Sequence, residues 1–241
     1  MNVFEMLKDK IDFYFITDGR WKYFTDGLKV TLQVTAGALL IGLVIGVFVS
    51  IIRSAHDQNP KKELSPGGII MTFLDAVCRL YLTVIRGTPT LVQLLLIYFF
   101  FLADLDNKIM TATVAFGINS GAYLAEIFRS GIMSIDQGQM EAGRSLGLGY
   151  AKTMQKIILP QAFKNTLPAL INEIITLLKE TSICGYIGLN DLTRGAEIIG
   201  GATYEFFVPL FAAAMIYLAI VMFFTWIMGK VEGRLRESDR R

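Results

Sequence analysis

The sequence predicts an all-α, polytopic membrane protein with about five transmembrane helices. Hydrophobic residues make up 53% of the 241 positions, which is more than a soluble domain of ordinary composition contains. Several apolar runs are also long enough to cross a bilayer, and charged loops separate them. The two cysteines, Cys78 and Cys184, lie in apolar surroundings without disulfide or metal-site spacing, so we expect free buried thiols.

Residues 1–26 form a mixed segment before the first span. Four of its apolar residues fall on one helical stripe: Phe4, Leu7, Ile11 and Phe15. This pattern indicates a short extracytoplasmic or interfacial helix, with a tethered polar tail as the alternative. Aspartates interrupt the segment, so no cleavable signal peptide is expected.

The first span is predicted over residues 31–52, which carry no charge. Gly42 and Gly46 give it a small-residue face that another helix could approach closely. The basic loop that follows, residues 53–68, is expected in the cytoplasm.

Residues 69–102 are too long for one straight span. We expect an amphipathic helix that begins at the cytoplasmic surface and pairs Asp75 with Arg79 one turn later. A break is predicted at Arg86-Gly87-Thr88-Pro89, after which the chain completes the crossing.

The remaining spans are predicted over residues 110–128, 165–189 and 206–228. A polar external loop, residues 191–205, separates the last two, and a basic cytoplasmic tail, residues 230–241, ends the chain. This arrangement puts the N-terminus outside and the C-terminus inside. Basic residues near the N-terminus oppose that orientation, and acidic neighbours offset them.

The central polar loop carries the most specific pattern. Glu141-Ala142-Gly143 is followed after three residues by Gly147, and after nine more by Ile157-Ile158-Leu159-Pro160. Helix-forming sequence on both sides of Gly147 and Gly149 predicts two short helices with a positive-φ corner at these glycines. Pro160 would stop the second helix or kink the next one. A polar hairpin between spans suits the docking of a soluble partner, with an ordinary cytoplasmic loop as the alternative.

Ionisable groups within the predicted spans form a second candidate site, because such groups are costly in lipid. Glu173 and Glu180 share a helix face, and Lys179 lies near mid-depth. With Arg86 and Glu126, they indicate a polar path that faces the bundle interior. Such a path offers a zwitterion an anion for its ammonium group and a cation for its carboxylate. The alternative is that these groups only neutralise one another or reach an interface.

Several strings then occur in the order typical of one family: Arg86 to Leu94 (RGTPTLVQL), Ala122 to Ile132 (AYLAEIFRSGI), the central loop, and Lys179 to Ser182 (KETS). Over about residues 27–229 the chain resembles the membrane subunits, or permeases, of ABC importers for polar amino acids. The central loop, residues 137–162, resembles their EAA loop. Gly143 departs from the usual Ala of that loop, which weakens the first helix by about 1 kcal/mol at most.

The resemblance implies a type I importer fold and an ABC transmembrane type-1 domain over residues 27–229. It implies a multi-pass permease in the cell membrane of a prokaryote, with a second permease subunit, a cytoplasmic ABC ATPase dimer and an extracytoplasmic amino-acid-binding protein as partners. The chain would be a transport subunit and not an enzyme. It has no GxxxxGK[ST] string, so no cofactor is expected on it, and ATP and Mg would belong to the ATPase.

The polar residues of the spans and the resemblance together predict roles for individual residues. The residues expected to couple to the ATPase are Glu141, Ala142, Gly143, Gly147, Ile157, Leu159 and Pro160. The residues expected along the substrate path are Arg86, Thr88, Gln93, Asn119, Tyr123, Glu126, Glu173, Lys179, Glu180 and Thr181. The amino acid stays open among glutamine, glutamate, arginine, histidine and cystine, as do a homodimer or heterodimer of permeases and a free, lipid-anchored or fused binding protein.

Two other classes compete with an importer. A stand-alone, ion-coupled secondary transporter could use Glu126, Glu173 and Glu180 as a proton relay, but the chain is short and lacks an inverted repeat. An intramembrane enzyme is disfavoured because the only histidine, His56, lies in a predicted loop and no HExxH string occurs.

Overall fold

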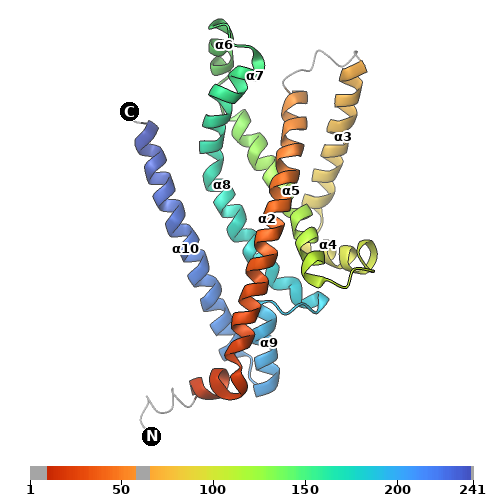
Figure 1. The fold of residues 1–241 in the computed structure, drawn as a ribbon, viewed down its shortest axis with the longest axis vertical. Coiled ribbons are helices and arrows are strands. Elements are labelled where there is room, and N and C mark those ends of the chain that lie inside the picture. Colours follow the sequence, from red (N-terminus) through yellow and green to blue (C-terminus); the bar gives the residue numbers. More distant parts are fainter. Residues whose placement is uncertain (1–9, 58–65, 240–241) are drawn as a thin grey trace. The chain divides into compact units, whose positions relative to one another are not determined.

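The computed structural model describes residues 10–57 and 66–239, and all regular structure within these ranges is helical. The predicted all-α fold is confirmed. Figure 1 shows the main helices: α2 (Trp21–Asp57), α3 (Pro66–Gly87), α4 (Thr90–Leu96), α5 (Lys108–Met133), α6 (Gln137–Ser145), α7 (Tyr150–Thr153), α8 (Leu159–Glu180), α9 (Leu192–Thr203) and α10 (Phe207–Asp239). The shorter turns are η1 (Asp12–Ile16), η2 (Thr17–Gly19), η4 (Ile97–Phe101), η5 (Met154–Ile158) and η6 (Thr181–Ile187).

Within the described ranges, three helices are both long and apolar enough to cross a membrane: Trp21–Asp57, Gly67–Gly87 and Phe207–Gly233. Helices α5 and α8, with 26 and 22 residues, also reach spanning length, although they carry more polar side chains. The fold is therefore that of a polytopic helical membrane protein with about five spans.

The chain forms two compact units. Unit 1 contains Met1–Ala38, Leu91–Phe116 and Ile175–Trp226, and unit 2 contains Leu39–Thr90, Gly117–Ile174 and Ile227–Arg241. Each unit has its own apolar core, and each is described separately below.

The core of unit 1 joins α2, α9 and α10. Its buried residues are Phe24, Leu192, Ala196, Ile199 and Ala213. A Cβ at Gly27 would lie 2.6 Å from the Asp191 carbonyl oxygen, and one at Gly195 would lie 2.5 Å from the Tyr23 carbonyl oxygen. The two glycines therefore allow α9 to lie directly against α2.

The predicted polar loop over residues 191–205 is wrong, because most of it is helix α9. Asp191 caps this helix by accepting hydrogen bonds from the backbone N–H groups of Thr193 and Arg194. The buried residues of α9 are Leu192, Gly195, Ala196, Ile199 and Gly200, which form a helical stripe. Its polar residues, which suggested a loop, occupy the other face.

The core of unit 2 joins α2, α3 and α5 through Val49, Ile52, Cys78, Leu82, Ala122 and Ala125. A Cβ at Gly46 would lie 2.7 Å from the Leu124 Cβ, and one at Gly42 would lie 3.2 Å from the Gly121 nitrogen. The predicted close-approach face of the first span is confirmed, and the helix packed against it is α5. Both cysteines are buried and free, as predicted.

Other boundaries differ in detail. The predicted break between α3 and α4 is confirmed at Thr88 and Pro89. The fourth span begins earlier than expected, at Leu159, and its α-helix ends at Glu180, where the 3-10 turn η6 follows. The π and 3-10 turns η1 and η2 precede α2, and the Phe15 ring packs 5.8 Å from that of Phe24. Phe4 and Leu7 of the predicted N-terminal stripe lie outside the described residues.

Candidate functional site

The central hairpin, residues 137–158, comprises α6, α7 and η5 and leads directly into α8 (Figure 1). Helix α6 is capped at its start by Asp136, whose Oδ1 accepts a 2.6 Å hydrogen bond from the Gly138 N–H. At its end, the Gly147 N–H donates to the Arg144 carbonyl at 3.0 Å, and the Leu148 N–H donates to the Gly143 carbonyl at 3.1 Å. This pair of bonds is a Schellman motif, which turns the chain out of the helix.

Gly147 provides the positive-φ corner that the sequence predicts. Its φ is +80°, and nothing lies within 4 Å of a Cβ built there, so the conformation alone favours glycine. The expectation of a second such corner at Gly149 is wrong: its φ of −68° and ψ of 161° are extended, and it caps the start of α7. The second helix then runs into α8 through one π turn, with Pro160 in the first turn of α8 rather than at a stop.

Gly143 is buried between the two arms of the hairpin. A Cβ there would lie 2.4 Å from Thr153 Cγ2, 2.9 Å from Thr153 Oγ1 and 3.2 Å from Ile157 Cδ1. Thr153 is fully buried, so it cannot move aside into solvent. The close contact of α6 with α7 therefore needs glycine at the position where the family pattern has alanine.

The outer surface of the hairpin exposes both charged and apolar groups. Among the residues expected to couple to the ATPase, Glu141, Ala142, Gly147, Leu159 and Pro160 are exposed, Ile157 is half-buried and Gly143 is buried. Leu146, beside the corner, is 81% exposed. The hairpin also borders a groove of about 380 Å³, to which Glu141, Arg144 and Asp57 contribute.

A cleft of about 590 Å³ lies among α3, α5 and α8 within unit 2. Four residues of the predicted substrate path line it: Arg86, Tyr123, Glu126 and Glu173. Sequence reasoning missed four further polar lining residues: Ser130, Ser134, Asn165 and Thr166. Uncharged polar residues carry no distinctive sequence signal, so only the fold reveals these four.

Opposite charges are held on the walls of this cleft. The Arg86 guanidinium lies over the Tyr123 ring, 5.7 Å from its centroid, and its Nη1 is 3.8 Å from Glu126 Oε2. Glu173 is 9% exposed, and its Oε1 accepts a 2.7 Å hydrogen bond from the Ser120 hydroxyl. The cleft thus presents one cation and two carboxylates to whatever occupies it.

The other predicted path residues do not line this cleft. Asn119 is buried in α5, and the Thr88 hydroxyl donates to the Val84 carbonyl at 2.7 Å. The residues that belong to unit 1 are Gln93, Lys179, Glu180 and Thr181. Of these, Gln93 and Thr181 are buried and Lys179 is exposed.

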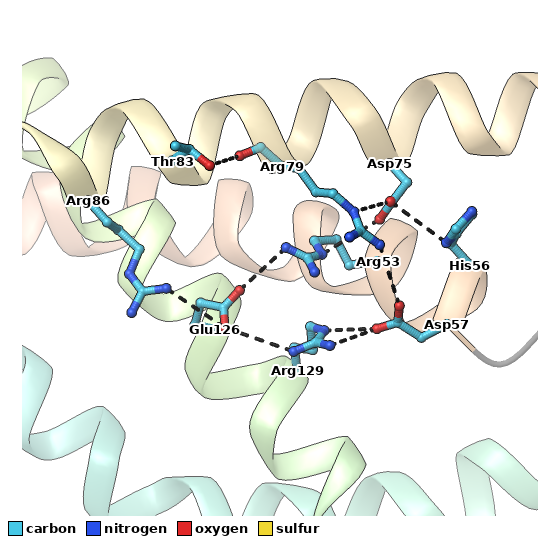
Figure 2. A network of polar contacts seen from close by, with 9 residues as sticks. All are labelled: Arg53, His56, Asp57, Asp75, Arg79, Thr83, Arg86, Glu126 and Arg129. Carbon is cyan, nitrogen blue, oxygen red and sulfur yellow. Dashed lines mark hydrogen bonds and ion pairs between the residues drawn. The ribbon is translucent and has the colours of Figure 1, made fainter.

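An ion-pair network joins α2, α3 and α5 in unit 2, as Figure 2 shows. The predicted Asp75–Arg79 pair is confirmed, with Arg79 Nε 2.5 Å from Asp75 Oδ2. Its other members are Arg53, His56, Asp57, Arg86, Glu126 and Arg129. Most of these pairs join two different helices, so spacing along one helix could not predict them.

Gly143 to Gly147 reads GRSLG, which matches the G-x-S-x-G string of hydrolases, but it lies at the end of α6 and follows a helical segment instead of the strand that a nucleophile elbow requires. Across residues 10–57 and 66–239, no group of three or more His, Cys, Asp or Glu side chains could hold a metal ion.

Comparisons with known proteins agree with this geometry. Residues 65–237 match the family described as binding-protein-dependent transport system inner membrane component. The chain is 38% identical to the arginine transport system permease protein ArtQ of Bacillus subtilis, covering 90% of this chain and 94% of that protein. It is 35% identical to a putative glutamine transport system permease protein GlnP of Rickettsia felis, covering 88% and 93%.

Solved structures are similar as well. One described as an amino acid ABC transporter with histidines is 38% identical, with a TM-score of 0.77 over 97% of this chain and 99% of that chain. An inward-facing MetNI methionine ABC transporter is 17% identical with a TM-score of 0.73 over 91% and 99%, which shows a shared fold.

Proposed function

The chain belongs to the family of binding-protein-dependent transport system inner membrane components, and from this premise we propose that it moves a polar amino acid through the cleft of unit 2 while its central hairpin docks on a separate ATPase. It is a permease subunit of an amino acid ABC importer and not itself an enzyme. A stand-alone secondary transporter is not favoured.

The observation that carries the substrate proposal is the arrangement of charge in the cleft. Arg86 can receive a carboxylate, whereas Glu126 and Glu173 can receive an ammonium group. The Ser120 hydroxyl orients Glu173, and the Tyr123 ring supports Arg86. These groups complement the α-carboxylate and α-ammonium that all amino acids share. They therefore support an amino acid as the substrate but do not indicate which amino acid side chain is preferred.

The docking proposal rests on the central hairpin. The Schellman motif fixes its corner at Gly147, and close packing of Gly143 against Thr153 holds α6 against α7. Leu146 is exposed beside the corner. A rigid element loses little conformational freedom on binding, which favours docking. Glu141 adds an exposed charge for specificity. The ATP and Mg would be held by the ATPase.

The proposal extends to the assembly. A second permease, of the same or a sister chain, an ATPase dimer and an extracytoplasmic amino-acid-binding protein would complete the importer. The chain would lie in a bacterial inner membrane. Because α10 ends in a basic tail, we place the C-terminus and the central hairpin in the cytoplasm and the N-terminus outside.

Reconstituted uptake tests this function. The chain is purified with its ATPase, placed in proteoliposomes, and supplied with its binding protein and labelled arginine, glutamine, glutamate, histidine or cystine. We expect uptake of at least one amino acid that requires ATP and persists after ionophores collapse ion gradients. Uptake that needs an ion gradient and no ATP would refute the importer assignment.

Matched glutamate variants test the cleft. Glu173→Gln should lower uptake by about tenfold or more, because a hydrogen bond to a charged group is worth about 1.5–3 kcal/mol. Glu197→Gln is the control, since Glu197 lies on α9 in unit 1, is half-buried, and forms an ion pair with Arg194 three residues away. Equal uptake by the two variants would refute a role for Glu173 in the path.

A further inference from the structure

Figure 2 shows ion pairs that run from Asp57 through Arg129 to Glu126. They link the groove beside the central hairpin with the cleft of unit 2. Asp57, at the end of α2, lines the groove together with Glu141 and Arg144. Glu126, on α5, lines the cleft. Arg129 makes ion pairs with both carboxylates, and all of these residues belong to unit 2.

Arg129 holds its two partners unequally. Its Nε donates to Asp57 Oδ2 at 2.9 Å, and its Nη2 lies 2.9 Å from the same oxygen. Its Nη1 lies 3.9 Å from Glu126 Oε2, which is a longer and weaker contact. The Arg129 side chain is 28% exposed and that of Asp57 is 19% exposed, so solvent screens this pair less than it screens a pair on the open surface.

Glu126 is surrounded by cations in this arrangement. Besides Arg129, Arg53 Nη1 lies 3.7 Å from Glu126 Oε1, and Arg86 Nη1 lies 3.8 Å from Glu126 Oε2. Three guanidinium groups therefore compete with a substrate ammonium for one carboxylate. Removal of any one of them makes Glu126 a better acceptor for that ammonium.

We propose that Arg129 is a positioning residue that transmits movement of the central hairpin to Glu126, an inference that rests on the proposed transport function. Because Arg129 is anchored on Asp57, a displacement of Asp57 relative to α5 draws the guanidinium away from Glu126. Glu126 then faces two cations instead of three and becomes available to the ammonium group of the substrate. By linkage, substrate bound at Glu126 favours the displaced hairpin and hence the ATPase state that goes with it.

The competing interpretation is a purely structural ion pair, in which Arg129 only holds α5 against α2. The two interpretations predict different effects of an Arg129 variant on assembly and on ATP hydrolysis. Loss of a structural ion pair lowers stability and assembly and leaves the response of ATP hydrolysis to substrate unchanged. Loss of the transmitting contact leaves assembly in place and reduces the response of ATP hydrolysis to substrate.

The test compares Arg129→Gln, Asp57→Asn and the double variant in the assembled complex with its ATPase and binding protein. The readouts are co-purification of the ATPase, basal hydrolysis, and the ratio of substrate-stimulated to basal hydrolysis. We expect either single variant to assemble and to lower the stimulation ratio by about fivefold, the lower range of ordinary coupling energies. The double variant should be no worse than either single one, because both remove the same contact.

Arg79→Gln is the matched control. Arg79 also lies in the network and contacts Asp57 at 3.9 Å, yet its other ion pair is with Asp75 and it makes none with Glu126. We expect this variant to keep the wild-type stimulation ratio. If assembly of Arg129→Gln fails, Arg129→Lys preserves the charge but replaces the planar fork by a single ammonium, and it should assemble and still lose stimulation.

Three results would overturn the inference: wild-type stimulation in an assembled Arg129 variant, an equal loss in Arg79→Gln, or losses that multiply in the double variant. The wild-type complex separates this inference from the proposed function. If wild type does not import with ATP, the transport function itself fails. If wild type imports and Arg129→Gln responds to substrate normally, only the role of Arg129 fails.

Discussion

Gly143→Ala should destabilise the central hairpin, although alanine is the better helix former and the usual residue of the family pattern. The added Cβ would lie 2.4 Å from Thr153 Cγ2 and 2.9 Å from Thr153 Oγ1. Because both γ atoms face Gly143, rotation about χ1 of Thr153 exchanges one clash for another. Overpacking destabilises by about 1–3 kcal/mol, and the higher helix propensity of alanine stabilises by about 1 kcal/mol. We therefore expect the free energy of opening the hairpin to fall by about 1 kcal/mol.

Hydrogen exchange of the hairpin amides in the purified complex measures this loss locally. A loss of about 1 kcal/mol raises the exchange rate about fivefold where local opening controls exchange. Thr153→Ala alone should also raise exchange, since it removes a buried side chain. The double variant should recover much of the protection, because the new methyl group fills the vacated space.

Two outcomes would refute this reasoning. Slower exchange in Gly143→Ala than in wild type would mean that helix propensity outweighs the steric conflict. Additive losses in the double variant would mean that Gly143 and Thr153 are not a complementary pair.

Three further predictions concern other parts of the chain. Burial raises the pKa of Asp191 to about 6 from its ordinary 3.8, so protonation of Asp191 favours the folded state. The melting temperature of wild type should therefore fall as the pH rises from 4 to 6.5. It should fall less in Asp191→Asn, whose side chain keeps the helix cap but does not titrate. Gly27→Ala should lower stability by about 1–3 kcal/mol in thermal unfolding, because its Cβ meets the Asp191 carbonyl, whereas Gly201→Ala, with nothing within 4 Å, should not. In a cysteine-free background, a cysteine at Asp106 should react with an impermeant thiol reagent added outside, and one at Gln155 should not; the reverse labelling would contradict the proposed orientation.

Sequence reasoning succeeded where the signal is local. The Schellman corner at Gly147 follows from a glycine between two helix-forming stretches, and the break at Pro89 follows from the restricted backbone of proline. The pair of Asp75 with Arg79 follows from spacing on one helix. In each case the residues that decide the structure are neighbours in the chain.

It failed where contacts depend on how helices pack. Residues 191–205 were expected as a loop because they are polar, but most of them form α9, in which Gly195 allows close contact with α2. Arg129 and Asp57 are 72 positions apart, so no periodicity within one helix could pair them. Likewise, the exchange of alanine for glycine at Gly143 is explained only by Thr153 on the facing arm.

The most direct measurement of the central claim is ATPase co-purification and ATP-driven uptake with Gly147→Asp. The variant adds a charge at a corner that we propose is buried on docking. The backbone φ of Gly147 is +80°, so any side chain at this position adds strain. Because nothing lies within 4 Å of that Cβ, the chain itself has room for the new side chain. We expect normal membrane levels, loss of the bound ATPase and loss of uptake, with a milder loss in Glu141→Lys. Wild-type co-purification and uptake from Gly147→Asp would contradict the assignment of the central hairpin as the docking element.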